Sequence, residues 1–192
     1  MVVLATTAVV LAFYLSLQFV FVLSYGRRPP GARASPLPRV TILKPLAGND
    51  DGLEDNLESF AQLDYPSFEL LLGVAHDSDP ALPIAQAFVR RHPEMEARVV
   101  RTNPAAASNP KVAQLLGMTG TGEVLLISDS NVRVAPDYLR VVAQGLSAPG
   151  VGLVTTLFAG TGEETMGAAL ENLQLGTMTT PGLLAVDLLS SR

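Results

Sequence analysis

Carboxylates follow two short apolar runs of the sequence at the points where these runs end. Asp129 comes just after residues 124–127, and Asp77 and Asp79 come just after residues 68–75. Apolar runs of this length, bounded by polar residues, are typical of strands buried on both faces of a parallel sheet. Ligands bind beyond the carboxyl ends of such strands, and adjacent strands lie only about 4.8 Å apart. The three acids are therefore expected to converge on one crevice and to hold a cation or a ribose there.

Carboxylates without basic partners suit a hard divalent cation, which takes carboxylate and phosphate oxygens as ligands. A nucleotide diphosphate bridged to the protein through Mg²⁺ or Mn²⁺ meets that description. The sequence has no GxGxxG after its first apolar run and no GxxxxGK[ST], so a cation would replace the usual phosphate-binding loops. Structural alternatives stay open: residues 128–131 all favour turns, and Asp77 and Asp79 can cap a helix that begins near Pro80.

Of the 13 basic residues, only Lys44 and Lys111 are lysines. Each adjoins a proline, one at the end of a predicted strand and the other where a loop meets a predicted helix. A compact ammonium in such a place suits a phosphate, and a solvated surface lysine is the alternative. His76 and His92 lack the neighbours of a zinc site, and no Ser-His-Asp arrangement is indicated.

The elements that must position these residues follow from the apolar periodicity. Strands are expected over residues 40–43, 68–75, 98–101, 123–127 and 151–157, and helices over residues 52–62, 81–91, 112–118, 136–146 and 163–176. Lys44-Pro45 is expected to end the first strand, and Asp50 or Asp51 to cap the first helix. Strands that alternate with helices imply βαβ units. The predicted fold class is therefore α/β, a mostly parallel sheet with helices on both faces.

Residues 2–23 carry no charge. About 20 apolar residues, each rising 1.5 Å, cross a hydrocarbon core of about 30 Å, so we expect a transmembrane anchor over residues 1–25. A cleaved signal peptide is disfavoured because no Lys or Arg precedes the run. A Pro/Arg-rich linker over residues 26–39 and a soluble domain over residues 40–192 follow. The linker arginines place that domain in the cytoplasm by the positive-inside rule.

The composition excludes some classes of site and partner. The chain has no cysteine, which excludes disulfides and thiolate metal sites and agrees with a reducing compartment. The net charge is −5 and no basic stripe interrupts the sequence, so binding to nucleic acid is not expected.

Several motifs between residues 40 and 176 resemble, in the same order, those of ceramide glucosyltransferases, the family-21 branch of inverting, GT-A-fold glycosyltransferases. They are Leu43-Lys-Pro-Leu46 with Gly48 and Asp50, Asn56-Leu-Glu58, Leu63-Asp-Tyr-Pro66, Asp79-Pro-Ala81, Asn109-Pro-Lys111, Asp129-Ser130 with Arg133-Val134, and Val151-Gly-Leu-Val154. The bacterial branch associated with hopanoid biosynthesis is most similar, through ISDSNVRV at residues 127–134 and ALENL at residues 169–173.

The resemblance implies a membrane-anchored inverting enzyme that moves glucose or N-acetylglucosamine from a UDP-sugar to the hydroxyl of a lipid, ceramide or a hopanoid. By analogy, Asp79 contacts the uridine and Asp129 binds Mg²⁺ or Mn²⁺ on the diphosphate. Asp77, Lys44 and Lys111 complete the candidate nucleotide-binding residues. The implied partners are the UDP-sugar, the lipid acceptor and the bilayer, which would be a bacterial inner membrane with the domain on its cytoplasmic side.

Two parts of the family's site do not occur in the sequence. The family carries a third Asp as general base and a later Gln/Arg-x-x-Arg-Trp motif, whereas this chain has no tryptophan. Asp187 lacks the family's motif and is not assigned as the base, so residues 40–192 are expected to be the donor-binding part of an incomplete domain. A second hypothesis is a non-catalytic membrane protein that binds a nucleotide or a partner. A GT-A enzyme acting on polyprenyl phosphate is disfavoured by the Lys-Pro-Leu and Asp-Tyr-Pro motifs.

Overall fold

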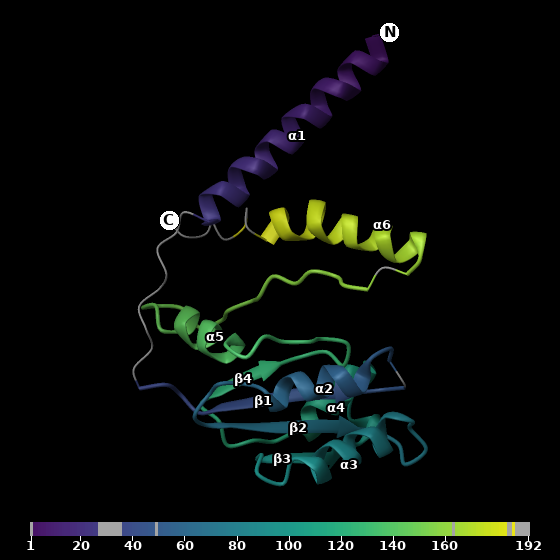
Figure 1. Cartoon of the computed structure of the whole chain (residues 1–192), viewed down its shortest axis with the longest axis vertical. Helices are drawn as coiled ribbons and strands as arrows, with labels where there is room; N and C mark the ends of the chain where they lie inside the picture. The colour runs from purple at the N-terminus through teal and green to yellow at the C-terminus, as the bar shows by residue number, and fades with distance from the viewer. Residues whose placement is uncertain (1, 27–35, 49, 163, 184–185, 187–192) are drawn as a thin grey trace. The chain divides into compact units, whose positions relative to one another are not determined.

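The computed structural model describes residues 2–26, 36–48, 50–162, 164–183 and 186 (Figure 1). The chain forms two compact units, Ala32–Gly152 on the one hand and Met1–Gly31 with Leu153–Arg192 on the other. Most of the predicted linker, residues 27–35, and the late acid Asp187 lie outside the described residues. The predicted boundaries at residues 25 and 39 stay predictions.

The unit Ala32–Gly152 is built on a parallel sheet, as expected. Its strands are β1 (Val40–Leu46), β2 (Phe68–Val74), β3 (Ala97–Arg101) and β4 (Val124–Ile127). They lie in the order β3-β2-β1-β4, and all three pairings are parallel. The chain proceeds outward from β1 to β3 and then returns to place β4 on the other side of β1. In open α/β sheets this reversal of strand order marks the place where ligands bind.

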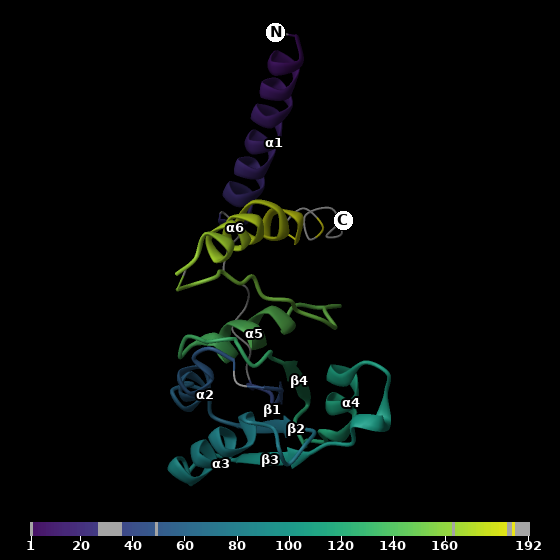
Figure 2. The same cartoon turned by 90° about the vertical axis from the view of Figure 1, so that its right-hand side faces the viewer.

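Helices cover both faces of this sheet, which confirms the predicted layering (Figure 2). They are α2 (Leu53–Ala61), α3 (Ala81–Arg91), α4 (Pro110–Gly117) and α5 (Tyr138–Leu146), with the 3₁₀ turn η1 (Pro104–Ala106) before α4. The larger core includes Phe60, Phe88 and Leu139 from α2, α3 and α5. The smaller core, on the face of α4, contains Leu71 and Met118.

The prediction that Lys44-Pro45 ends β1 is wrong, because the strand continues to Leu46. Pairing with β2 extends through Leu46, whereas pairing with β4 ends at Leu43. The Leu43 carbonyl faces β4 and accepts a hydrogen bond from the Ser128 amide at 3.0 Å. Residues 43 and 45 direct their backbone groups to the same side of the strand, toward β4. The amide hydrogen that Pro45 lacks would therefore point to a side where the pairing with β4 has already ended, and no hydrogen bond of the sheet is lost.

The predicted cap of α2 is also wrong. The N-cap residue of α2 is Gly52, with φ of 69°, and none of the described side chains caps this helix. The Asp50 backbone carbonyl accepts a hydrogen bond from the Leu53 amide at 3.1 Å, which leaves the Asp50 carboxylate available for another partner. The left-handed backbone at residue 52 explains the glycine there, since other residues adopt it at a cost.

A fifth strand over residues 151–157 is not observed, and this prediction is wrong. The described backbone there has no regular structure, and Leu153 is 85% exposed. Among the described residues, no strand pairs with this apolar run, so no ladder holds it extended. A short apolar run does not by itself distinguish a strand from other structure.

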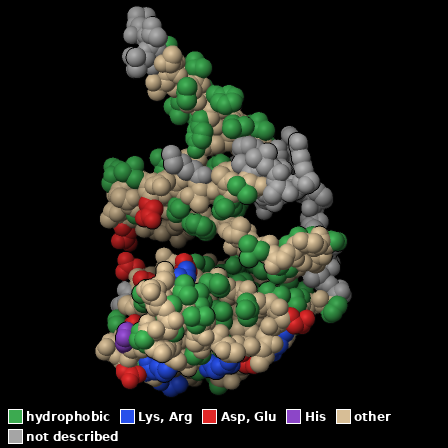
Figure 3. All heavy atoms as spheres, turned by 180° about the vertical axis from the view of Figure 1, so that it is seen from behind, with side chains coloured by type: hydrophobic (Ala, Val, Ile, Leu, Met, Phe, Trp, Pro, Cys, Tyr) green, Lys and Arg blue, Asp and Glu red, His purple; other side chains and the backbone are tan. Residues whose placement is uncertain are grey.

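The second unit contains α1 (Val2–Gly26), α6 (Met166–Gln174) and the π-helical turn η2 (Leu175–Thr179). The predicted helix over residues 163–176 starts later than expected because the Thr165 hydroxyl caps it, accepting from the Ala168 amide at 3.1 Å. Figure 3 shows large apolar side chains exposed along α1. Val9 and Phe13 are among the exposed residues of this helix. Among the described residues, no helix has both the length and the apolarity that crossing a membrane requires, so the anchor predicted over residues 1–25 is not confirmed.

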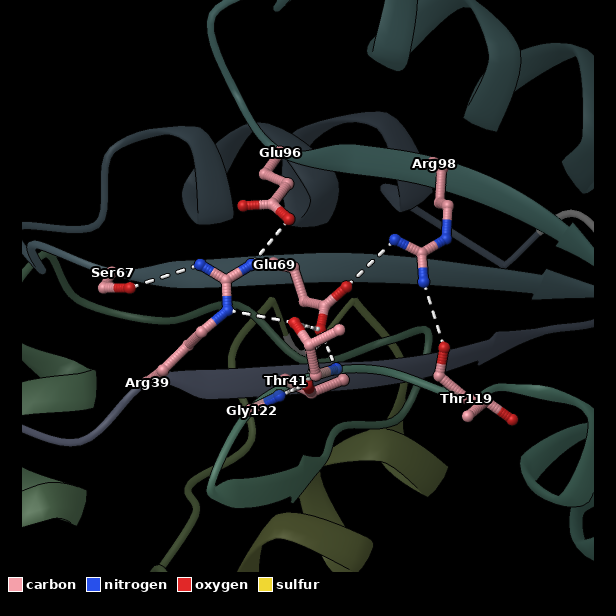
Figure 4. A network of polar contacts seen from close by, with 9 residues as sticks. Arg39, Thr41, Ser67, Glu69, Glu96, Arg98, Thr119 and Gly122 are labelled. Carbon is pink, nitrogen blue, oxygen red and sulfur yellow. Dashed lines mark hydrogen bonds and ion pairs between the residues drawn. The ribbon is translucent and has the colours of Figure 1, made fainter.

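Glu69 organises a buried polar network near the amino ends of the strands (Figure 4). Its carboxylate accepts hydrogen bonds from the Thr41 hydroxyl at 2.8 Å, from the Arg98 guanidinium at 2.9 Å and from the amide and hydroxyl of Thr121. The Gly122 amide donates to the Thr41 hydroxyl at 2.8 Å. A Cβ at residue 122 would lie 2.7 Å from that hydroxyl oxygen. The network therefore joins the segment before β4 to β1, β2 and β3.

Acid sensitivity tests this network. Burial raises the pKa of Glu69, but hydrogen bonds from Thr121, Thr41 and Arg98 outweigh it and lower that pKa to about 2. A carboxyl with a lowered pKa in the folded state stabilises the protein above its unfolded pKa, and this stabilisation is lost as pH falls toward the folded pKa. Between about pH 4.5 and pH 2 the wild-type protein should lose about 3 kcal/mol that Glu69→Gln does not lose.

Urea unfolding followed by circular dichroism at several pH values measures this difference. The matched control is Glu164→Gln, because the Glu164 side chain is exposed, and it should keep the wild-type pH dependence. An equally acid-sensitive Glu69→Gln protein would contradict the assignment.

Candidate functional site

A cavity of about 520 Å³ opens at the carboxyl ends of β1 and β4. Three segments form it: the loop after β1, the turn after β4, and the start of α4. Its lining residues are Pro45, Leu46, Ala47, Asp50, Asn109, Pro110, Lys111, Gln114, Asp129, Ser130 and Asn131. The volume is in the range of small-molecule sites. The cavity thus lies at the reversal of strand order, where a ligand is expected in a sheet of this kind.

The loop after β1 brings a carboxylate into the cavity and is tied down at two points. The Asp50 carboxylate accepts a hydrogen bond from the Ser130 hydroxyl. Gly48, with φ of 75°, donates its amide to Asp79 Oδ1 at 3.0 Å. The same Asp79 oxygen accepts from the Ala81 amide at 2.9 Å. Asp79 therefore anchors this loop to the start of α3. It is not the N-cap residue weighed from the sequence, because that residue is Pro80 and no side-chain cap is found at this helix among the described residues.

Lys111 and Asp129 form an ion pair across the cavity. Asn109 places Lys111, because its side-chain oxygen accepts from the Lys111 amide at 3.0 Å and from the Val112 amide at 3.2 Å, and Pro110 follows in the first helical turn. This is a standard N-terminal cap. The two paired side chains keep 49% and 56% of their surface exposed, so the pair is accessible to solvent and to a ligand.

Lys44 lies beneath the cavity and is fully buried. Its ammonium donates to the Asp129 carbonyl at 2.5 Å, to the Val132 carbonyl at 3.2 Å and to the Ser128 hydroxyl at 3.4 Å. Burial lowers the pKa of Lys44 to about 7, against the opposing effect of the Asp129 and Asp50 carboxylates. The amine therefore holds the backbone of the turn that carries Asp129.

The five predicted site residues do not all meet. Asp129 and Lys111 line the cavity, Lys44 lies under it, and Asp79 holds one of its loops. Asp77 lies outside: its side chain is 90% exposed and pairs with the Arg101 guanidinium at 2.5 Å. The expected convergence of all three acids fails because β1 separates β2 from β4 in the sheet. A direct contact of Lys44 or Asp79 with a nucleotide stays a prediction.

Sequence reasoning gave Asp50 no role in the site, although it named this residue as a possible helix cap and within one of the family motifs. The signal that could have identified it is its position after β1, the strand that pairs with β4. Gln114 was missed as well; its amide donates to the Leu46 carbonyl at 3.0 Å and closes the side of the cavity nearest α4. No pattern in the sequence separates this glutamine from an ordinary helix residue.

The donor set of this cavity fits a divalent cation that arrives together with phosphate oxygens. In the part of the chain that the structure describes, no cluster of three or more His, Asp or Glu side chains could hold an ion by itself. Asp50 and Asp129 nevertheless line the same cavity. Mg²⁺ typically binds through one or two carboxylates and completes its shell with substrate phosphates and water. Asp50 and Asp129 could therefore contribute to holding such a cation only together with oxygens of a ligand or of water.

Comparison with known proteins gives concordant matches. Residues 2–192 match the model of the family described as Glycosyl transferase family 21. Ceramide glucosyltransferase 1 of Caenorhabditis elegans is 31% identical over 144 residues, which cover 73% of this chain and 31% of that protein. The ceramide glucosyltransferase of Komagataella phaffii is 38% identical over 106 residues, 52% of this chain and 21% of that protein.

The chain thus spans about a third or less of the length of these two relatives. Among solved structures, a mannosyltransferase from Pyrobaculum calidifontis in complex with GDP-Man and Mn²⁺ is similar, with a TM-score of 0.55 and 22% identity. The match covers 77% of this chain and 45% of that protein. At this level of identity the likeness shows the fold, which is α/β and GT-A-like.

Removal of the Lys111 ammonium tests whether Asp129 faces a cation site. Because the Lys111 ammonium occupies Asp129 Oδ1 and repels a second cation, Lys111→Gln should raise the affinity for Mn²⁺ alone several-fold. The exposed ion pair contributes at most about 1 kcal/mol to stability, so the fold should be retained. Electron paramagnetic resonance of free Mn²⁺ gives the affinity.

Arg101→Gln is the matched control, since it breaks an Arg–Asp pair outside the cavity, and it should leave Mn²⁺ binding unchanged. Equal affinity in Lys111→Gln and the wild type would argue against a cation site at Asp129.

Proposed function

The chain belongs to glycosyl transferase family 21, and on that premise we propose that its cavity binds the diphosphate of a UDP-sugar together with Mg²⁺ or Mn²⁺. The observation that carries this proposal is the meeting of Asp50, Asp129 and Lys111 at the reversal of strand order. Carboxylates and an ammonium in one cavity are complementary to a cation and a phosphate. The relatives' names as ceramide glucosyltransferases and the GDP-Man and Mn²⁺ of the similar structure support the same ligand class.

Each residue of the cavity has a part in this proposal. Asp129 would hold the cation, and Asp50 is placed to complete its carboxylate ligands. Lys111 would exchange its partner, leaving Asp129 for a phosphate oxygen of the donor. A divalent cation bound to the diphosphate of a UDP-sugar forms a unit without net charge. It could therefore enter beside Asp50, Asp129 and Lys111 without a large change in the charge of the cavity.

The proposed reaction is transfer of glucose or N-acetylglucosamine to a lipid hydroxyl with inversion. The hydroxyl oxygen bonds to the anomeric carbon, the bond from that carbon to the diphosphate oxygen breaks, and UDP leaves with the electron pair. The cation, when bound, neutralises charge on the leaving diphosphate. Asp129, Asp50 and Lys111 hold and orient the donor. The hydroxyl proton goes to a general base that we do not assign to any residue of this chain.

We further propose that the acceptor is ceramide or a hopanoid and that the protein acts at a bilayer, with the Ala32–Gly152 unit in the cytoplasm. The names of the relatives support a lipid acceptor. The charge-free sequence of residues 2–23 and the exposed apolar side chains of α1 support contact with lipid.

Loss of the Asp129 carboxylate tests the donor site. Changes around metal ligands commonly cost about 10–100-fold in metal affinity, so loss of a direct ligand in Asp129→Asn should weaken Mn²⁺-dependent UDP binding by about 100-fold or more. Calorimetric titration of UDP with and without Mn²⁺ measures the effect, and circular dichroism verifies that the fold is retained.

Asp77→Asn is the matched control, because this acid also follows a strand but lies outside the cavity, and it should bind like the wild type. The proposal fails if Asp129→Asn keeps wild-type affinity, or if Asp77→Asn loses it.

Contact with lipid has its own test. Val9 and Phe13 are 69% and 70% exposed on α1, and a charge there is costly to bury in hydrocarbon. Val9→Glu with Phe13→Glu should shift the protein from the membrane fraction to the soluble fraction, whereas Val141→Glu, an exposed position on α5, should not. Retention of the double variant in the membrane fraction would contradict the proposal.

A further inference from the structure

Lys44 occupies a position that the strand pattern assigns to the apolar core. Alternate residues of a strand point to the same face, and Val40, Ile42 and Leu46 of β1 all pack in the larger core. Lys44 shares their parity and is equally buried. Its ammonium lies 4.4 Å from the centroid of the Phe60 ring, within the range of a cation–π contact. A charged side chain thus stands where an apolar one would complete the core.

Within the described part of the chain, the hydrogen bonds of this ammonium go to the turn after β4. The acceptors are the carbonyls of Asp129 and Val132 and the hydroxyl of Ser128. The Val132 amide in turn donates to the Asp129 carbonyl at 3.2 Å. Lys44 therefore joins both ends of the turn that presents the Asp129 side chain to the cavity.

Helix α2 supports the same turn from the side. The Asn56 side-chain amide donates to the Ser130 carbonyl at 3.5 Å, and the Ser59 hydroxyl accepts from the Val134 amide at 3.1 Å. These two contacts hold the edge and the exit of the turn. Lys44, Asn56 and Ser59 all make hydrogen bonds with residues 128–134. Of these three side chains, only Lys44 contacts the carbonyl of Asp129.

Burial of a lysine is costly, and its contacts offset this cost only in part. Met at residue 44 would remove the desolvation cost of the ammonium, but it would also leave the carbonyls of Asp129 and Val132 without this donor. The two effects oppose each other, so the sheet gains little net stability from Lys rather than Met at this position. The ammonium is explained by the turn that it holds and not by the stability of the sheet.

We infer that Lys44 is a positioning residue for the donor site: its buried ammonium fixes the turn at residues 128–132 so that the Asp129 carboxylate faces the cavity. The effect of Lys44 on ligand binding rests on the proposed function. Its structural part, the restraint on the turn, stands on the contacts of Lys44 alone.

The test compares Lys44→Met with the wild-type protein in three measurements. Thermal unfolding should show a midpoint close to that of the wild type, because removal of a desolvated amine offsets the loss of its hydrogen bonds to the turn. Amide hydrogen exchange at residues 128–132 should become faster, most clearly at the Val132 amide. Affinity for UDP in the presence of Mn²⁺ should fall about tenfold or more, the range seen when groups supporting a metal ligand are changed.

Ile42→Val is the matched control for stability. It removes a methylene from the same face of β1 and leaves the hydrogen bonds of Lys44 in place, so it should lower the unfolding midpoint without changing exchange at the turn or affinity for UDP. If Ile42→Val and Lys44→Met lose affinity together with stability, the role of Lys44 is only structural and the inference is overturned.

A chemical rescue separates the charge from the packing. The chain has no cysteine, so Lys44→Cys can be aminoethylated at that position alone after unfolding and then refolded. The modified side chain carries an amine at nearly the length of lysine, and it should restore slow exchange at the turn and affinity for UDP. Failure of this rescue in a folded protein would overturn the inference.

The remaining outcomes are also decisive. Wild-type affinity and exchange in Lys44→Met would overturn the inference, as would failure of this variant to fold, because the ammonium would then be needed by the sheet itself. Absence of Mn²⁺-dependent UDP binding in the wild-type protein would instead overturn the proposed function. Hydrogen exchange would still decide whether Lys44 restrains the turn.

Discussion

The pairing of β1 with β4 is the constraint on which the rest of the site depends. Because β4 returns to the free side of β1, the loop after β1 and the turn after β4 lie next to each other. The Asp50 carboxylate and the Ser130 hydroxyl join these two segments directly. Asn109 adds the Lys111 ammonium from the first turn of α4. A site for an ion and a phosphate thus arises from three segments far apart in the sequence, brought together by one strand pairing.

Two buried charged side chains serve opposite ends of this sheet. At the amino ends, Glu69 accepts hydrogen bonds that link β1, β3 and the segment before β4, and its lowered pKa reflects their strength. At the carboxyl ends, Lys44 donates to the turn after β4. The hydrogen bonds of Glu69 hold the segment that leads into β4, and those of Lys44 hold the backbone that follows it. The short strand between them pairs with β1 only, among the described residues, so these two restraints add to a single ladder.

Much of the framework could be predicted from sequence, since periodicity and bounded apolar runs report burial directly. The helices α2 to α5 lie within two residues of their expected ends, and the layered parallel sheet is confirmed. Local sequence patterns do not predict the order of strands in a sheet. Asp77 was therefore grouped with Asp129, and Asp50 was given no role in the site. The strand expected over residues 151–157 failed for a related reason, because its apolar pattern does not reveal whether a partner strand exists. Lys44 was placed near the nucleotide, whereas only the structure reveals its burial and its contacts with the turn.

The central claim is that a divalent cation and a nucleotide diphosphate meet at the carboxyl ends of β1 and β4. Nuclear magnetic resonance of the labelled protein with Mn²⁺ and UDP tests it most directly, because paramagnetic broadening reports proximity to the ion without any substitution. The account predicts broadening of the resonances of Asp50, Lys111, Ser130 and Asn131, and sharp resonances for Thr41, Glu69 and Arg98 at the other end of the sheet. Broadening centred on His76 and Asp77, beyond β2, with sharp signals from Ser130 and Asn131, would contradict it.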